Sequence, residues 1–169
     1  MKITLKTLTA IGKYSGNWDK LMAHLGKSET DDQPLSIAVI IDSNGLEIAL
    51  ECLQDVKGFD REIRLYAVWC ARQVQHLLRY KPSLDAINVA ERFANGMASP
   101  QELENARRAA EPFAPGSTFE PAARAALACA MASAADAALA ASDAAGQAGC
   151  DEELQKRRLR ELCAAGEGS

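Results

Sequence analysis

The segment from Phe119 to Ala145 constrains the fold more than any other part of the chain, because more than half of its residues are alanine. Alanine loses no side-chain entropy in a helix, and β-branched residues are sparse beyond Val74. One helix over this segment would extend about 40 Å at the usual rise per residue. Its large apolar residues, Leu127, Met131 and Leu139, lie within one stripe. We therefore predict a long alanine-rich helix whose small side chains let neighbouring helices approach closely.

Apolar spacing and capping residues predict short helices over most of the remaining chain. One begins after Thr4, although residues 2–6 also alternate in the manner of a strand. The central helix begins at the cap residue Asp60 and runs to about Tyr80, with apolar side chains around most of its circumference. Such a helix belongs in the middle of a core. The other predicted helices cover residues 17–25, 46–56, 82–94 and 100–111 and the chain from residue 151.

Two of these helices have recognisable start signals. Ser99 to Glu102 is a capping box with proline in the first turn, and Asn17 can cap the helix that follows the break from Gly12 to Gly16. The prolines and glycine between Pro112 and Gly116 form the one rigid-looking linker in the sequence.

The apolar run from Leu35 to Ser43 can form either a buried helix or a buried strand, because periodicity alone does not separate the two. Pro34 suits the first turn of a helix, and Asn44-Gly45 suits its end. We therefore favour a helix that starts at Pro34. Asn44-Gly45 is also the strongest short hairpin signal, so the strand alternative stays open.

These elements predict an all-α fold of about eight helices, either solenoid-like or an irregular bundle with the long alanine-rich helix. We expect one domain over residues 1–169, since a chain of this length can bury a core without metals or disulfides. Within it, residues 1–111 would form the N-terminal helical core, and residues 119–169 the alanine-rich helix and a C-terminal amphipathic helix.

The bulk composition indicates a soluble cytoplasmic protein. The net charge of −4 gives no indication of direct nucleic-acid or membrane-surface binding. No segment reaches the roughly 20 apolar residues that span a bilayer, and the N-terminus has no apolar run of signal-peptide type. The five cysteines form no CxxC pair, which favours a reducing compartment; they are Cys52, Cys70, Cys129, Cys150 and Cys163.

The residues that usually carry chemistry form no recognisable constellation. His24 and His76 have no neighbouring serine or cysteine that the sequence singles out, and Cys70 and His76 lie on different helix faces. The glycines are scattered at helix ends, and glutamate followed three residues later by histidine does not occur. We assign no catalytic, cofactor-binding or metal-ligating residue, and we expect no cofactor and no enzymatic activity.

Two charged patterns are candidates for recognition. Glu47, Glu51 and Asp55 fall at i, i+4 and i+8, which predicts an exposed acidic row on one helix that faces either solvent or a basic partner surface. The arginines of the central helix are expected to have an internal structural role; they are Arg61, Arg64, Arg72 and Arg79.

The stretch from Asn44 to Leu103 carries a resemblance, above all in the segment RLYAVWCARQVQHL at residues 64–77 and in Ala90-Glu91-Arg92 with Gly96. It resembles uncharacterised helical proteins carried by phages, prophages and other mobile elements, and its core is similar to an immunity-protein family of polymorphic-toxin loci. The C-terminal half of those proteins is often a repetitive helix with tryptophan, whereas residues 119–145 contain none. The resemblance implies a binding function and transfers no catalytic residue.

The sequence and the resemblance together predict a non-enzymatic inhibitor that binds and blocks a host defence or regulatory protein, in the manner of an anti-CRISPR protein. The alternatives are an immunity protein that neutralises a toxin and, in a different class, an enzyme or small-molecule binder with a polar pocket around His24 or His76. The partner is expected to be another protein, with Glu47, Glu51 and Asp55 as the contact residues. Self-association through alanine-rich faces into a homodimer is left open.

Overall fold

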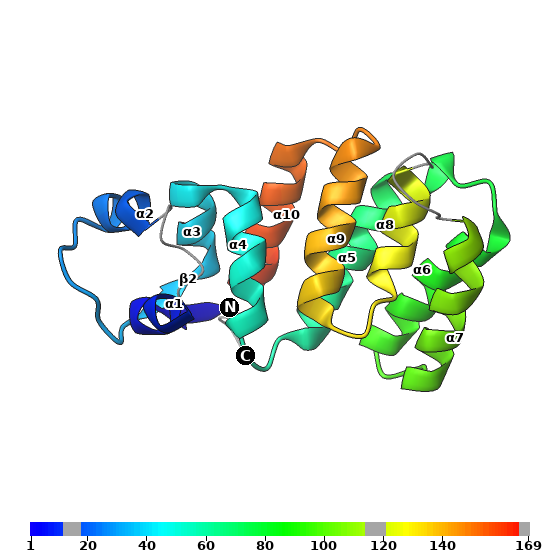
Figure 1. Cartoon of the computed structure of the whole chain (residues 1–169), viewed down its shortest axis with the longest axis horizontal. Coiled ribbons are helices and arrows are strands. Elements are labelled where there is room, and N and C mark those ends of the chain that lie inside the picture. The colour runs from blue at the N-terminus through cyan, green and yellow to red at the C-terminus, as the bar shows by residue number, and fades with distance from the viewer. Residues whose placement is uncertain (12–17, 114–120, 166–169) are drawn as a thin grey trace. The chain divides into compact units, whose positions relative to one another are not determined.

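Figure 1 shows the computed structural model of the chain, which describes residues 1–11, 18–113 and 121–165. Within these ranges there are ten α-helices, three short 3-10 helices and one two-stranded sheet, so the predicted all-α class is confirmed. The chain forms two compact units, one from Met1 to Gly58 together with the chain from Lys156 onwards, the other from Phe59 to Gln155. The unit boundaries therefore follow Gly58 and Gln155 and not the predicted linker at 112–116, while the single domain over 1–169 stays a prediction.

The first unit contains most of the short elements. They are β1 (Lys2–Thr4), α1 (Leu5–Ile11), α2 (Trp18–Leu25), β2 (Pro34–Ser36), α3 (Ile37–Asn44), α4 (Leu46–Cys52) and the 3-10 helix η1 (Leu53–Asp55). The second unit contains the longer helices. They are α5 (Asp60–Gln73), η2 (Gln75–Leu77), α6 (Lys81–Ala94), α7 (Pro100–Ala110), η3 (Glu111–Phe113), α8 (Pro121–Cys129) and α9 (Ala134–Gln147). Helix α10 (Glu152–Ala165) starts in the second unit and continues in the first.

The first unit begins with a small antiparallel sheet, in which Ile3 of β1 lies opposite Leu35 of β2. The helix predicted after Thr4 is confirmed as α1. The prediction of a helix starting at Pro34 is wrong by three residues, since Pro34 to Ser36 form β2 and helix α3 follows. Ser36 explains the shift, because its side chain accepts a hydrogen bond from the Ala38 amide at 3.3 Å and caps α3.

Helices α3 and α4 carry the aliphatic core of the first unit. Ile37 and Ile40 of α3 and Leu46 and Leu50 of α4 are all buried, as is Leu53 at the start of η1. Gly45 separates the two helices with φ at 93°, a left-handed conformation that side chains disfavour, and its amide bonds the Ile41 carbonyl. The predicted helix over 46–56 is therefore confirmed only as far as Cys52, after which the chain tightens into η1.

Helix α5 is the central element of the second unit and packs against α6, α8 and α9. Its buried residues cover most of its circumference, as predicted, and Trp69 is half-buried against the ring of Tyr66. The predicted extension to Tyr80 is wrong, because α5 ends at Gln73. No glycine or proline marks this end. The Arg72 side chain, which bonds Gln75 and reaches Asn88 on α6, holds the chain in the turn that follows.

The alanine-rich segment forms two helices, α8 and α9, which lie side by side in Figure 1. The single long helix predicted over 119–145 is therefore wrong. Ser133 caps α9 by accepting a hydrogen bond from the Asp136 amide at 3.2 Å, so the chain turns back between Cys129 and Ser133. Alanine favours helix everywhere, and thus it marks neither the end of α8 nor the start of α9.

Other predicted helix ends agree with the structure. The capping box at Ser99 is present, with its side chain bonded to the Glu102 amide and the Glu102 carboxylate bonded to the Ser99 amide. Asn95 and Gly96 follow α6, and Asp151 accepts a hydrogen bond from the Leu154 amide at the start of α10. The predicted break at Gly12 to Gly16, the Asn17 cap and the 115–116 part of the linker lie outside the described residues.

Candidate interaction surface

The predicted acidic row lies on α4 and η1 in the first unit. Glu47 is exposed, Glu51 and Asp55 are half-buried, and one carboxylate oxygen of Asp55, Oδ2, is buried without a hydrogen bond. Because α4 ends at Cys52 and η1 has three residues per turn, Asp55 leaves the regular i+4 spacing of the row. The structure therefore keeps Glu47 and Glu51 on one face of α4, with Glu47 the more exposed of the two, and separates Asp55 from them.

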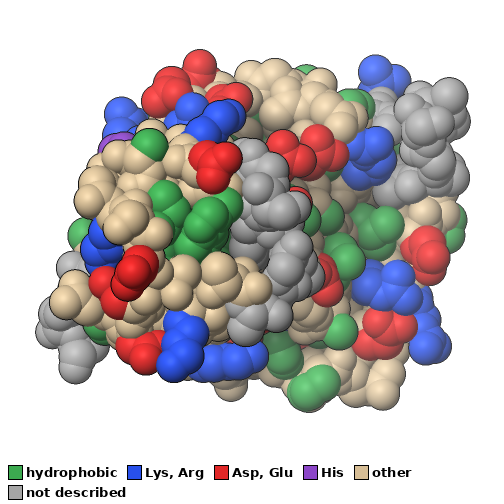
Figure 2. Space-filling view, turned by 60° about the vertical axis from the view of Figure 1, so that its left-hand side comes forward, with side chains coloured by type: hydrophobic (Ala, Val, Ile, Leu, Met, Phe, Trp, Pro, Cys, Tyr) green, Lys and Arg blue, Asp and Glu red, His purple; other side chains and the backbone are tan. Residues whose placement is uncertain are grey.

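The carboxylates of Glu47 and Glu51 have no compensating charge among the residues that the structure describes. Neither carboxylate makes a hydrogen bond or an ion pair with any residue in the described ranges. On α7, by contrast, Arg107 and Arg108 both bond Glu104, and the bond from Arg107 is the main reason that the pKa of Glu104 falls to about 2. Figure 2 shows that acidic and basic side chains lie interspersed over the face it displays. Uncompensated carboxylates on one short helix are thus a local feature that can attract a cationic group.

The two histidines lie in different units and neither forms a catalytic pair. His24 is exposed in the last turn of α2, and His76 is exposed in η2. Neither imidazole ring donates or accepts a hydrogen bond with a described residue. The sequence predicts a polar pocket around one of them as the alternative to protein binding, and neither histidine lines the pocket described next.

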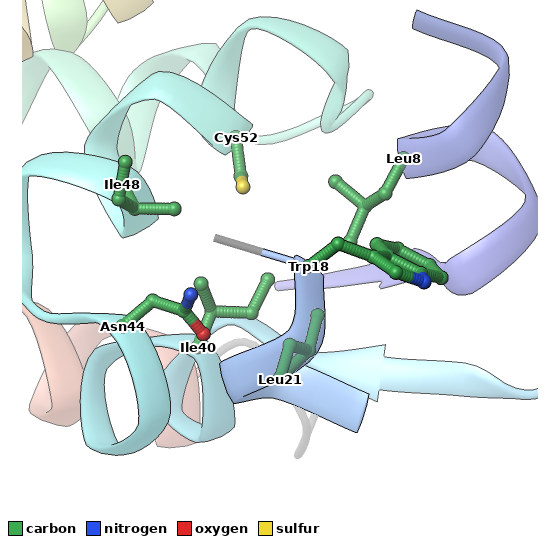
Figure 3. Close-up of a pocket in the computed structure, with 7 residues that line it drawn as sticks. All are labelled: Leu8, Trp18, Leu21, Ile40, Asn44, Ile48 and Cys52. Carbon is green, nitrogen blue, oxygen red and sulfur yellow. The ribbon is translucent and has the colours of Figure 1, made fainter. Parts of the chain in front are cut away.

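That pocket is in the first unit, between α1, α2, α3 and α4 (Figure 3). Its cavity volume is about 10 Å³, roughly the space of one water molecule. Asn44 is the one polar residue among those that line it, and the lining consists of Leu8, Trp18, Leu21, Ile40, Asn44, Ile48 and Cys52. The cavity is too small and too apolar for a cofactor or a metabolite.

The cysteines of the second unit are poor nucleophiles. Burial raises the pKa of the Cys70 thiol and raises that of Cys129 to about 12, so neither forms a thiolate near neutral pH. Cys150 is half-buried, and burial raises its pKa as well. Among the described residues, no group of three or more His, Cys, Asp or Glu side chains is arranged to hold a metal ion.

Arg64 has the structural role expected for the arginines of the central helix. It is only 3% exposed, and its guanidinium donates to the backbone carbonyls of Cys129, Met131 and Ala132 at 3.0, 2.6 and 2.7 Å. These carbonyls belong to the turn between α8 and α9, where the negative end of the α8 dipole lies. Its guanidinium carbon is 5.2 Å from the centre of the Phe93 ring, and burial lowers its pKa. Arg64 therefore fixes the turn that sequence reasoning missed.

A buried polar cluster joins three helices of the second unit. The Ser142 hydroxyl donates to the side-chain oxygen Oε1 of Gln155, and the Tyr66 hydroxyl oxygen lies 3.4 Å from the Ser142 hydroxyl oxygen. All three residues are buried, and burial is the main cause of the raised pKa of Tyr66. The cluster contains no group that could act as a base near neutral pH, so its role is structural. Sequence reasoning missed it because the partners are 76 and 13 residues apart.

A second surface feature, also missed from the sequence, lies where η2 meets α6. Leu77, Tyr80 and Leu84 are 43%, 47% and 37% exposed. The prediction that α5 continues to Tyr80 placed Leu77 in the core, which hid this feature. The basic residues Arg79 and Lys81, both exposed, lie between these apolar positions.

No protein-family description, no curated protein and no solved structure matches the chain. No helix in the described ranges is both long enough and apolar enough to cross a lipid bilayer.

Proposed function

We propose that the chain is a non-enzymatic protein-binding inhibitor of a phage or another mobile element, which blocks a host defence or regulatory protein by occlusion, as anti-CRISPR proteins do. The observation that carries this proposal is the acidic face of α4, where Glu47 and Glu51 have no compensating charge within the described residues. The resemblance of residues 44–103 to mobile-element proteins supports a phage or other mobile-element origin for the chain. Toxin neutralisation by an immunity protein is the alternative, since it uses the same kind of surface.

Helix α4 is well suited to present such charges. Leu46, Ala49 and Leu50 bury one face of the helix in the aliphatic core, which holds the opposite face in place. A rigid surface loses little conformational entropy when it binds, and uncompensated carboxylates add long-range attraction to a basic partner. The expected partner surface is therefore rich in lysine and arginine, as in proteins that bind nucleic acids.

The partner can be found by capture from a lysate of the native host with a tagged chain, followed by mass spectrometry. A defence or regulatory protein supports the inhibitor role, whereas a toxin supports the immunity role. The position of the gene, among phage genes or beside a toxin gene, separates the same two outcomes.

The contact surface is then tested with the charge reversal Glu47→Lys, alone and combined with Glu51→Lys. Glu29→Lys is the matched control, because Glu29 is also exposed, belongs to the same unit and makes no bond to a described residue. We expect the double reversal to weaken binding of the captured partner about a hundredfold, and Glu29→Lys to change it less than about threefold. Equal affinities for the two would refute α4 as the contact surface. Asp55 is left unchanged, because its partly buried carboxylate makes a reversal there a test of folding.

A further inference from the structure

The pocket of the first unit has a buried floor and a half-buried rim. The residues of the floor are all buried; they are Leu8, Leu21, Ile40 and Cys52. The residues of the rim are half-buried; they are Trp18 of α2, Asn44 at the end of α3 and Ile48 of α4. Figure 3 shows the Cys52 thiol and the side chains of Ile40 and Ile48 pointing into the same space. The pocket therefore reaches the surface of the unit beside α4.

The pocket suits an apolar group better than it suits water. A buried water needs several polar partners, and Asn44 is the one polar residue in the lining. The side-chain oxygen Oδ1 of Asn44 already accepts a hydrogen bond from the Ser43 hydroxyl at 2.6 Å. A cavity volume of about 10 Å³ admits the end of one aliphatic side chain, whereas an aromatic ring is too large for it. An aliphatic group in this space would gain contacts that water cannot replace.

Acidic side chains lie beside this rim on α4. Glu51 follows Ile48 by three residues, so the two side chains are neighbours on the helix surface, and Glu47 lies one turn before Glu51. Neither carboxylate is bonded to a described residue. On α2 the exposed residues Asp19 and Lys20 carry opposite charges, so the described surroundings of the rim keep a net negative charge.

This combination of shape and charge selects the kind of occupant. Charge complementarity with Glu47 and Glu51 requires a basic surface. A second copy joined face to face would bring the acidic residues of both copies together, and an anionic membrane would repel them. A segment of another protein that carries an aliphatic side chain between lysine or arginine residues satisfies both requirements.

We propose that the pocket receives one aliphatic side chain of the partner protein, and that lysine or arginine residues on either side of it pair with Glu47 and Glu51. This inference rests on the proposed function, because it specifies which part of the partner meets the α4 face. The aliphatic group contacts Ile40 and Ile48 in a preformed pocket and anchors the segment. The basic residues select the sequence around the anchor.

The proposal is tested on the full isotope-labelled chain by nuclear magnetic resonance titration with three short synthetic peptides. The first carries leucine between lysines, the second alanine between lysines, and the third leucine between glutamates. The indole N–H resonance of Trp18 reports on the pocket, and that of Trp69 in the second unit is the internal control. We expect the leucine–lysine peptide to shift the Trp18 resonance alone, and to bind about tenfold more tightly than either of the others.

Variants then connect this binding to the pocket and to the charges. Ile48→Ala removes part of the rim and should weaken the leucine–lysine peptide about fivefold. Val39→Ala is the matched control, since Val39 is also β-branched, half-buried and in the same unit but does not line the pocket. Cys52→Met fills the pocket from its floor and should lower the affinity to that of the alanine peptide. Glu47→Gln with Glu51→Gln should remove the preference for lysine over glutamate.

Three outcomes would overturn the proposal. The first is equal binding of the leucine and alanine peptides, or of the lysine and glutamate peptides. The second is an equal effect of Ile48→Ala and Val39→Ala, a comparison that stays decisive if Cys52→Met does not fold. The third is a dimer in analytical ultracentrifugation that Ile48→Ala dissociates, which would assign the pocket to a second copy.

Failure of this inference is distinct from failure of the proposed function. If the captured host protein binds Ile48→Ala as tightly as the parent chain, while charge reversal at Glu47 and Glu51 weakens it, the α4 face is the contact surface and the anchor in the pocket is wrong. If no host protein is captured but the peptides bind as expected, the proposed function fails and the selectivity of the pocket stands.

Discussion

The two units of the chain build their cores in different ways. The first unit buries large aliphatic side chains, such as Leu5, Ile37 and Leu50. The second unit relies on alanine, most of all along α8 and α9, where almost every buried side chain is alanine. The buried polar or charged residues of the described chain all lie in this second unit; they are Arg64, Ser83, Ser142 and Gln155.

The difference suggests how each core specifies its arrangement. Large branched side chains interlock, so their shapes alone define how α3 and α4 pack. The small side chains of an alanine face do not interlock, so helices that pack through such a face can slide or rotate against each other at a small cost in free energy. Directional hydrogen bonds can define the position of such helices instead. Arg64 makes such bonds at the α8–α9 turn, and Ser142 makes one between α9 and Gln155. We infer that polar bonds define the register of the second unit, and side-chain shape that of the first.

Arg64→Ala tests most directly whether polar bonds define the register of the second unit. It leaves the carbonyls of Cys129, Met131 and Ala132 without their donor and opens a cavity beside Phe93. We expect a loss of about 3–5 kcal/mol in the free energy of unfolding, measured by denaturant titration.

Arg61→Ala is the matched control for that variant, since Arg61 is on the same helix but exposed, with bonds to Glu62 and Asn95. We expect it to cost less than about 1 kcal/mol. If both variants cost the same, the Arg64 bonds are not what holds the α8–α9 turn.

A pair of leucine variants on α9 tests whether alanine occurs there because the helices pack closely. Ala141 on α9 is 0% exposed, whereas its neighbour Ala140 is half-buried. Leucine at position 141 should force the packed helices apart and cost about 1–3 kcal/mol, while leucine at position 140 should be close to neutral. Thermal and denaturant unfolding of the two variants measure the difference. A neutral Ala141→Leu would mean that the alanine face is loosely packed and that close approach is not why alanine occurs there.

Sequence patterns predicted the helix ends that depend on neighbouring residues, but not those that depend on residues far away in the chain. Local signals were sufficient where a cap and its acceptor lie three residues apart, as at Ser99, and where glycine ends a helix, as at Gly45. They were insufficient where a helix ends through distant contacts. The end of α5 depends on Arg72 reaching α6, and the end of α8 depends on Arg64 from α5.

The predictions of surface residues also succeeded only where the local helix was predicted correctly. Helical phase alone placed Glu47 and Glu51 on one face, and the structure agrees. Asp55 was misplaced because the helix tightens after Cys52. The exposed side chain of Leu77 was missed because the central helix was predicted to run to about Tyr80, whereas α5 ends at Gln73.

The smallest expected effect comes from Tyr66→Phe, which removes one hydroxyl from the buried cluster and keeps the ring that packs against Trp69. The Tyr66–Ser142 contact is long at 3.4 Å, and Ser142 keeps its bond to Gln155, so we expect a loss of only about 0.5–1.5 kcal/mol in the free energy of unfolding. If polar bonds define the register of the second unit, the variant should also broaden the amide resonances of α9 in nuclear magnetic resonance spectra while those of α3 and α4 stay sharp. Unchanged spectra with the expected small loss of stability would show that the hydroxyl adds energy but not specificity, and would leave Arg64 and the Ser142–Gln155 bond as the features that distinguish the alanine core from the aliphatic one.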